Sequence, residues 1–453
     1  MAERVWIGEL IAQLHRGKID RREFMKRAAA AGLSASLISQ VVAAHAARAQ
    51  EGTPASVVGQ VGMPGIEHIT DTSKGTIRLY SSWPMIAASA QIGGDSAEAV
   101  RLALEDFGNA AGGFALEYEA LDDAIASTGS WDPGKEAENA NRVVSDMDAM
   151  VYIATYNSGA AKISIPILNQ AEPGPMAMIS PANTYPGLSK STEFNDEGEP
   201  DIYYPTGKRN YMRVVPSDEI QGGAAANWAY NENGNRRAYV LHDNQLYGKG
   251  LASVFEATFR ELGGEILGFE GFDPNAPSYR ALMTSIASRN PDLVYLGAIV
   301  NLNASKLLQD MRAVMPADRV AFLGPDGLIN QAFIDGAGDA AEGAYITFGG
   351  VPASALEGIG ADWAQRMRER LGHEPDAYAA YSYEAAVVAI QAIDQVQEKD
   401  RVKILDAMFA TEGFNGLLGT WSFTETGDTD STTVSLNQVQ GGQITFLKRI
   451  GRA

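Results

Sequence analysis

The feature that most restricts the fold is a regular alternation of short apolar runs with amphipathic segments, which begins at Gly75. The amphipathic segments place apolar residues three and four positions apart, the spacing of one helix face. In this first series we predict strands at residues 76–80, 115–121, 149–154 and 176–179, and helices at 95–112, 134–147 and around 163–168. Such strand–helix–strand repetition predicts an α/β fold with a doubly wound parallel sheet.

A second series of the same kind starts at Met212. Its predicted strands are residues 237–241, 265–269, 292–297 and 320–323, with helices centred on Ala224, Phe255, Met283 and Leu308. The chain leaves this series at residues 344–348, continues through three helices near Trp363, Ala385 and Ile404, and ends in strand-like segments at 420–423, 432–436 and 443–447. A chain of this length is too long for one hydrophobic core, so we expect two lobes around a cleft.

Charge and composition exclude several classes of function. The formal net charge is −20, and residues 1–49 contribute +4, which leaves −24 for the rest. Such an acidic surface repels phosphate groups and argues against nucleic-acid binding. The chain has no cysteine, so disulfides, thiolate metal sites, thiol catalysis and a lipid-anchoring cysteine are excluded. We expect no cofactor and no metal, because the few histidines lack zinc-ligand spacing and no phosphate-binding loop motif is present.

The N-terminus has the organisation of an export signal. Asp20-Arg21-Arg22-Glu23-Phe24-Met25-Lys26 resembles the twin-arginine signal, and a weakly apolar stretch with small residues at 47–49 follows it. The alternative is a basic surface helix. Because the basic, apolar and small-residue segments follow one another in the order of an export signal, we predict a signal peptide at 1–49 and a lead-in at 50–74. We also predict a soluble periplasmic protein without a lipid anchor.

Hydroxyl-bearing residues follow two neighbouring strands of the first series. Residues 149–154 lead into Asn157-Ser158-Gly159, and residues 176–179 lead into Ser180-Pro181-Ala182-Asn183-Thr184. Open α/β sheets bind ligands at the carboxyl ends of their strands. Hydroxyls and helix-start N–H groups at that edge suit a small carboxylate. Ser158 and Thr184 would otherwise serve as helix caps.

A long polar stretch at residues 185–210 interrupts the alternation of strands and helices. We interpret it as a solvated loop in preference to a catalytic lid, because most acidic runs are solvated.

Several short motifs occur in a fixed order along the chain. They are Asp122-Asp123 followed by Asp132-Pro133, Asn157-Ser158-Gly159, Ile179-Ser180-Pro181-Ala182-Asn183-Thr184, Arg213-Val214-Val215-Pro216, His242-Asp243 followed by Tyr247-Gly248-Lys249-Gly250, Phe322-Leu323-Gly324-Pro325-Asp326-Gly327, and Ala340-Ala341-Glu342-Gly343. Together they resemble the type I periplasmic solute-binding proteins of the leucine/isoleucine/valine-binding class, the receptors of ABC amino-acid importers. The resemblance covers roughly residues 75–448.

This resemblance implies two lobes joined by three crossovers, near Pro216, Phe348 and Gly419. The first lobe would be residues 75–216 plus 349–418, and the second 217–348 plus 419–453. It also implies a monomer that closes around a small apolar or branched-chain amino acid and docks on a membrane permease.

The resemblance also assigns ligand contacts. Ser158 and Thr184 match residues that hold the amino-acid head group, and the carbonyl of Ala182 matches an acceptor for the ammonium. Asp326 stands where the class has a glutamate that pairs with the ammonium from the other lobe. Aspartate is one methylene shorter than glutamate, so either the lobes close further or a water intervenes.

Other positions depart from the pattern of the class. Ile92 and Ile299 replace tyrosines, and Trp131 and Asn157 replace two cysteines that some members pair. Trp83 lies in the first strand–helix loop. We expect four side chains to be either walls of the ligand pocket or ordinary core residues: Trp83, Ile92, Tyr156 and Ile299.

Three alternatives remain at this point. In the first, the same fold binds a short amide, urea or an aromatic acid. Asp326 distinguishes such a ligand from an amino acid, because a buried carboxylate favours a cationic group and penalises a purely anionic ligand. The second alternative is a periplasmic hydrolase. It needs a nucleophile and a base in the cleft, and His242-Asp243 has no accompanying nucleophile motif. A sensing domain without transport would need a separate signalling partner.

Overall fold

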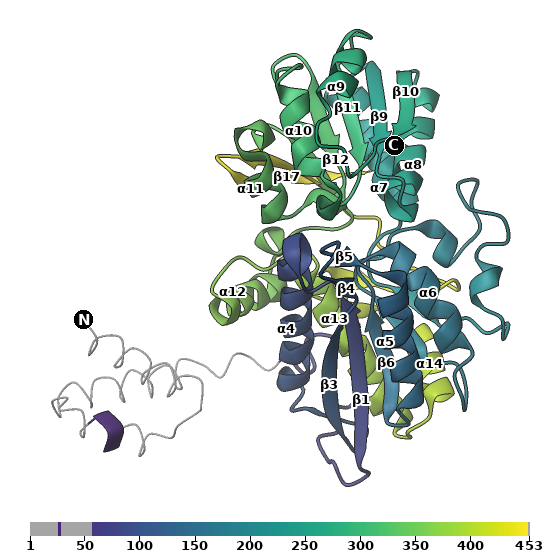
Figure 1. The fold of residues 1–453 in the computed structure, drawn as a ribbon. Coiled ribbons are helices and arrows are strands. Elements are labelled where there is room, and N and C mark those ends of the chain that lie inside the picture. Colours follow the sequence, from purple (N-terminus) through teal and green to yellow (C-terminus); the bar gives the residue numbers. More distant parts are fainter. Residues whose placement is uncertain (1–25, 29–56, 452–453) are drawn as a thin grey trace. The chain divides into compact units, whose positions relative to one another are not determined.

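The computed structural model describes residues 26–28 and 57–451. Most of the predicted signal, residues 1–49, and part of the lead-in therefore lie outside the described residues. Residues 58–451 build two α/β lobes, one around the sheet that contains β1, β3 and β6 and the other around the sheet that contains β9, β11 and β12 (Figure 1). The predicted fold class, two α/β lobes, is confirmed.

The first lobe contains a six-stranded sheet with the order β2-β3-β1-β6-β7-β8. Its strands are β1 (Thr76–Trp83), β2 (Ala110–Ala111), β3 (Phe114–Asp122), β6 (Ala149–Ala154), β7 (Ala177–Ser180) and β8 (Tyr211–Arg213). All pairings are parallel except that of the short strand β2 with β3. The carboxyl ends of β1, β6 and β7 therefore meet at one edge, which faces the second lobe.

Among the described residues, six α-helices belong to this lobe. They are α4 (Ala90–Asp106), α5 (Pro133–Ser145), α6 (Ser158–Asn169), α12 (Ile359–Leu371), α13 (Ala379–Val396) and α14 (Arg401–Phe409). Asp132 starts α5 by accepting a hydrogen bond from the N–H of Lys135, with Pro133 in the first turn. The helix predicted at 95–112 begins earlier, at Ala90, and ends earlier, because Gly108 has positive φ and turns the chain out of the helix.

The second lobe contains a seven-stranded sheet with the order β10-β9-β11-β12-β13-β16-β17. Its strands are β9 (Arg237–His242), β10 (Glu265–Gly271), β11 (Leu293–Gly297), β12 (Ala321–Gly324), β13 (Tyr345–Phe348), β16 (Val434–Gln440) and β17 (Gln443–Ile450). The helices are α7 (Asp218–Asn227), α8 (Leu246–Glu261), α9 (Arg280–Ala287), α10 (Ala304–Arg312) and α11 (Gln331–Ala337). β16 and β17 are antiparallel to their neighbours, so this sheet is mixed and not purely parallel as expected.

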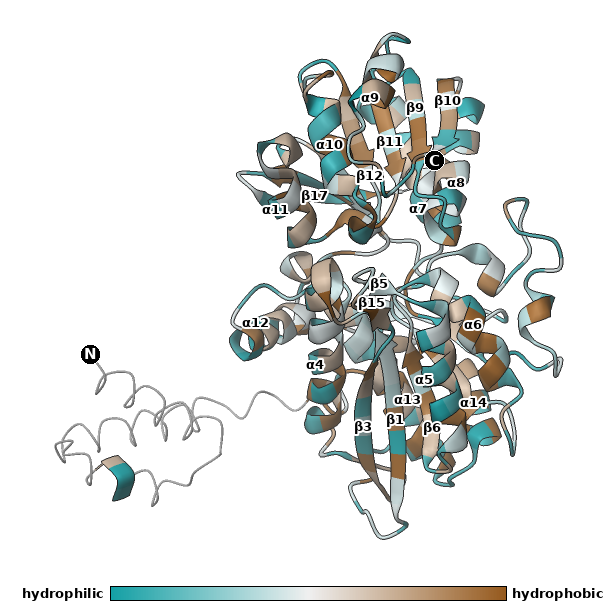
Figure 2. Ribbon diagram, viewed as in Figure 1, coloured by the Kyte–Doolittle hydropathy of each residue, from teal (hydrophilic) through white to brown (hydrophobic). Residues whose placement is uncertain are grey.

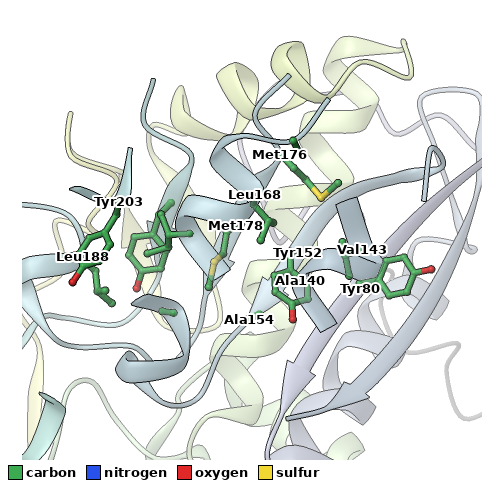
Figure 3. Close-up of a cluster of buried hydrophobic side chains, with 14 of the residues drawn as sticks. Tyr80, Ala140, Val143, Tyr152, Ala154, Leu168, Met176, Met178, Leu188 and Tyr203 are labelled. Carbon is green, nitrogen blue, oxygen red and sulfur yellow. The ribbon is translucent and has the colours of Figure 1, made fainter. Parts of the chain in front are cut away.

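Each lobe has its own apolar core. In the first lobe, side chains from β6, β7, α5 and α6 pack together, among them Tyr152, Leu168 and Met178 (Figure 3). In the second lobe, Phe255 stacks on Tyr295 with 4.0 Å between ring centroids. Figure 2 shows hydrophobic residues on the central strands and hydrophilic residues on the outer helices.

The C-terminal part of the chain returns to both lobes. The hairpin of β14 (Phe414–Gly416) and β15 (Gly419–Trp421) packs on α13, where the Trp421 Nε1–H donates to Glu384 over 2.8 Å. Asp428 then contacts Arg213 of β8. These contacts favour a third crossover between Asp430 and β16, later than the expected position near Gly419.

Residues 185–210 are solvated only in part, since Glu193, Asp196 and Glu197 are exposed but the two ends of the segment are not. Tyr185, Leu188 and Tyr203 are buried, and the buried Glu199 carboxylate accepts hydrogen bonds from the Tyr185 and Tyr203 hydroxyls. The acidic composition indicates the exposed residues correctly but not Glu199, whose buried carboxylate is satisfied by tyrosine hydroxyls. The segment therefore packs against the first lobe next to the ligand-binding edge.

The lead-in also packs on the first lobe where it is described. His68 Nδ1 lies 2.8 Å from Asp394 of α13, and the N–H of Ile69 donates to the same carboxylate.

Candidate functional site

The loop after β7 is fixed by its own polar side chains. The Ser180 hydroxyl accepts from the N–H groups of Ala182 and Asn183 at 3.1 and 2.8 Å, and donates to the carbonyl of Thr155. The Asn183 amide donates to the carbonyls of Thr155 and Tyr156. The loops after β6 and β7 are thus joined, and they hold the two predicted hydroxyl residues at one place.

A small cavity lies between the lobes at this edge. The first lobe contributes residues that follow β6 and β7 and precede α13, and the second contributes residues from α8 and from the loops after β11 and β12. The lining residues are Tyr156, Asn157, Ser158, Ala182, Tyr247, Ile299, Asp326, Gly327 and Tyr378. The remaining space is about 10 Å³, enough for roughly one water molecule.

Asp326 lines this cavity and accepts two hydrogen bonds there. Its carboxylate accepts a hydrogen bond from the Tyr247 hydroxyl over 2.7 Å, and a second from the Tyr378 hydroxyl. The Tyr247 hydroxyl also accepts from the N–H of Gly327. Since Tyr378 belongs to the first lobe, its bond to Asp326 joins the two lobes.

Burial dominates the protonation chemistry here. Asp326 is 3% exposed, and desolvation raises its pKa, although hydrogen bonds from Tyr247 and Tyr378 oppose this effect. Burial also raises the pKa of Tyr156, Tyr247 and Tyr378 well above the usual value. The three phenols are therefore neutral donors at physiological pH.

Five of the eight predicted site residues meet at this cavity: Tyr156, Ser158, Ala182, Ile299 and Asp326. The others do not line it. Trp83 and Ile92 are buried in the first lobe, at the end of β1 and within α4, where they belong to the core.

Thr184 lies directly behind the cavity and is fully buried. Its carbonyl accepts from the N–H of Asp218 over 2.9 Å. Neither its hydroxyl nor the buried Asp218 carboxylate has a hydrogen-bond partner among the described residues. The hydroxyl is near enough to oppose the large rise in the pKa of Asp218 that burial causes.

Four lining residues were not predicted: Asn157, Tyr247, Gly327 and Tyr378. Tyr247 and Gly327 belong to motifs that carried the family resemblance, so those motifs could have indicated them. Tyr378 had no such signal, because it precedes α13, more than fifty residues beyond the last of the predicted ligand contacts. Tyr156 and Tyr378 pack edge to face, with 5.4 Å between ring centroids.

The two positions that replace cysteines both lie beside the site. Asn157 lines the cavity, and Trp131 packs against Gly159, where a Cβ atom would lie 2.7 Å from the indole ring. Only glycine fits at that position, directly after Ser158.

The charge of the cavity has one sign. Asp326 is its charged lining residue, and no lysine, arginine or histidine is among the residues that line it. Such a site favours a ligand with a protonated amine over an anion. Within the part of the chain that the structure describes, no cluster of acidic residues or histidines is suited to hold a metal ion.

A second contact joins the lobes away from the cavity. The Ser89 hydroxyl donates to Asn301 Oδ1 over 2.6 Å, and Asn301 Nδ2 donates to the carbonyl of Gly129 over 2.7 Å. Asn301 lies in the second lobe, and its two partners lie in the first. These bonds and the Tyr378–Asp326 bond join the two lobes.

Comparison with known proteins gives a consistent result. A family model described as "Periplasmic binding protein" matches residues 77–443. The Leu/Ile/Val-binding protein homolog 1 of Brucella abortus is 28% identical over 300 residues, 66% of this chain and 73% of that protein. A leucine-, isoleucine-, valine-, threonine- and alanine-binding protein of Pseudomonas aeruginosa is 26% identical, over 78% of this chain and 87% of that one.

Solved structures agree in fold. A leucine-binding protein of Thermotoga maritima superimposes with a TM-score of 0.72 at 25% identity, over 83% of this chain and 99% of that chain. A solute-binding protein of R. palustris in complex with benzoate gives a TM-score of 0.68 at 19% identity, over 84% of this chain and 98% of that chain.

Proposed function

Since this chain belongs to the periplasmic binding protein family, we propose that it is the substrate-binding receptor of an ABC importer and closes around a small apolar or branched-chain amino acid. The observation that carries the proposal is the meeting of Ser158, Ala182 and Asp326 from two lobes at one cavity. The relatives named for leucine, isoleucine and valine support the same ligand class.

In the proposed complex the amino-acid head group replaces the Tyr378 hydroxyl at Asp326. The ammonium takes the place of a neutral donor, so the buried carboxylate gains a full countercharge. Ser158 holds the ligand carboxylate, Thr184 joins it once the site widens to admit the ligand, and the Ala182 carbonyl accepts from the ammonium. Ile299 and Tyr156 then form apolar walls for the side chain.

Closure follows from the division of these contacts between lobes. A ligand that bonds to Ser158 in one lobe and to Asp326 in the other binds the closed form more tightly than the open one. Binding therefore shifts the open–closed equilibrium toward the closed form, which we propose docks on a membrane permease.

An exported, monomeric protein without a lipid anchor or cofactor is part of the proposal. It is supported by the signal-like composition of residues 1–49 and by the absence of cysteine. Among residues 26–28 and 57–451, no helix combines the length and hydropathy of a membrane span.

A thermal-shift screen of the chain from Gln50 tests the ligand class. The panel contains the twenty amino acids, benzoate, 4-hydroxybenzoate, urea and acetamide. We expect an apolar amino acid at a large excess over its Kd to raise the melting temperature, because ligand that binds only the folded state stabilises it. No shift with any amino acid would contradict the proposal.

The second candidate is an aromatic acid, which the tyrosines around the cavity favour and which similar folds bind in their crystal structures. A shift with benzoate but not with amino acids would support it. The lack of any cationic side chain at the cavity favours the amino acid. Hydrolysis of amide or ester substrates at enzyme-like rates would instead establish an enzyme.

A further inference from the structure

Arg213 is a fully buried arginine that does not touch the cavity. It lies at the end of β8, and its guanidinium bonds to four separate oxygens. Nη1 donates to the carbonyls of Asn183 and Tyr185 at 3.1 and 2.9 Å, Nη2 donates to the Ser189 hydroxyl at 2.5 Å, and Nε donates to Asp428 Oδ1 at 2.6 Å.

The first two of these carbonyls flank Thr184. In a trans peptide the C=O and the following N–H point in opposite directions, and the Asn183–Thr184 bond is not among the cis bonds of the structure. Because the Asn183 carbonyl points at Arg213, the Thr184 N–H points away from it. The guanidinium thus fixes the direction of the Thr184 N–H, the backbone donor that we predict to contact the ligand carboxylate.

The remaining bonds tie this arrangement to the crossovers. Asp428 lies on the segment that leads to the second lobe, and the N–H of Arg213 donates to the carbonyl of Gly427 over 2.9 Å. Lys190 Nζ lies 3.3 Å from Asp428 and 3.2 Å from Glu219, at the start of α7 in the second lobe. Ser189 and Lys190 both belong to the 185–210 segment.

We propose that Arg213 is a positioning residue of the ligand site: it orients Thr184 through the carbonyls of Asn183 and Tyr185, and Asp428 holds it in place. The segment at 185–210 then braces the ligand loop against the crossovers. This inference rests on the proposed amino-acid function, but its first test needs no ligand.

The test compares Arg213→Lys with Arg401→Lys. Arg401 is also buried and bonds to four backbone carbonyls, of Val144, Asp146, Ala149 and Glu172. Those carbonyls lie at the opposite edge of the first sheet, where β6 begins. A lysine has one ammonium and cannot reproduce the planar fork of bonds, so both variants lose a comparable structural contact.

In the ligand-free protein, we expect Arg213→Lys to speed hydrogen–deuterium exchange of peptides covering residues 180–188, and Arg401→Lys to leave them unchanged. In calorimetry with L-leucine, we expect Arg213→Lys to lose roughly tenfold or more in affinity, the effect of one lost bond to a charged group. Arg401→Lys should bind like wild type.

Asp428→Asn is the second variant if Arg213→Lys does not fold. It keeps the arginine but weakens its anchor, so a smaller rise in exchange at 180–188 is expected. Unchanged exchange in the folded variants, or an equal effect of Arg401→Lys, would overturn the inference. If exchange changes as expected but wild type binds no amino acid, the proposed function fails and the positioning role stands.

Discussion

At the scale of single residues, the ligand model depends most directly on Asp326. The substitution Asp326→Asn is nearly isosteric, and it removes the charge that would face a ligand ammonium. We expect amino-acid binding to weaken by roughly 2–5 kcal/mol, the range for breaking a buried charge pair. The matching 2-keto acid should lose much less, because it has no ammonium. Calorimetry with both ligands measures the difference.

The exposed Asp335 of α11 provides the matched control, since Asp335→Asn removes the same charge far from the cavity lining. Equal losses for amino acid and keto acid in Asp326→Asn would show that Asp326 has only a structural role at its turn.

Ser158 is the counterpart of Asp326 in the first lobe. Its hydroxyl has only a long contact, 3.4 Å, with the N–H of Tyr185, so Ser158→Ala should leave the fold intact. Loss of a bond to the ligand carboxylate should cost about 1–3 kcal/mol of binding free energy. The control is Ser253→Ala, on the surface of α8. If both variants bind with wild-type affinity, Ser158 does not contact the ligand.

At the scale of elements, the start of α13 links the site to solution pH. Asp376 Oδ1 accepts from the N–H of Tyr378, and burial, with a contribution from Asp95, raises the pKa of Asp376 to about 7 from 3.8. A folded-state pKa above the unfolded value means that the folded chain binds the extra proton. Stability from this group is therefore present at low pH and is lost as pH rises from about 4 to about 7.

We therefore expect Asp376→Asn to flatten the pH dependence of the free energy of unfolding. As pH rises through this window, the free energy of unfolding of the variant should increase relative to that of wild type. The increase is about 1.4 kcal/mol at most for each unit of pKa shift removed. Urea unfolding between pH 4.5 and 7.5 measures the effect. Parallel curves for the two proteins would show that the carboxyl titrates normally.

The strands, unlike the start of α13, could be predicted from the sequence. Runs such as residues 149–154 are wholly buried, so hydropathy alone marks them, and the hydroxyls that follow indicate a ligand-binding edge. Tyr378 could not be found this way, because nothing in the local pattern tells which helix start faces the cleft. Trp83 ends β1 and Ile92 lies in α4, and packing makes both of them core residues, the second of the two outcomes that the sequence left open.

The partial burial of residues 185–210 could not be predicted for a similar reason. Local composition indicates exposure, whereas the Glu199 carboxylate is satisfied by hydroxyls of Tyr185 and Tyr203, an arrangement that depends on tertiary contacts.

At the scale of the whole molecule, closure involves more than the ligand. Asn301→Ala removes both bonds to Ser89 and Gly129 that join the lobes outside the cavity. We expect the ligand-free protein to open, with a larger radius of gyration in X-ray scattering. The apparent affinity for amino acid should fall several-fold, because a smaller fraction is ready to bind.

The surface residue Asn141 of α5 bonds only within its own helix, so Asn141→Ala should change neither quantity. An unaltered radius of gyration in Asn301→Ala would mean that this contact does not set the open–closed balance.

The return of the chain to both lobes has a consequence for synthesis. Until β16 is made, β13 is the unpaired edge of the second sheet, and until α13 and α14 are made, the first lobe lacks two of its helices. A ribosome must therefore release almost the entire chain before either lobe can be completed. Unlike a protein built from consecutive domains, this one cannot finish folding its N-terminal half first, because the first sheet has all its strands by Arg213 but its helices α13 and α14 are made only after β13 of the second sheet.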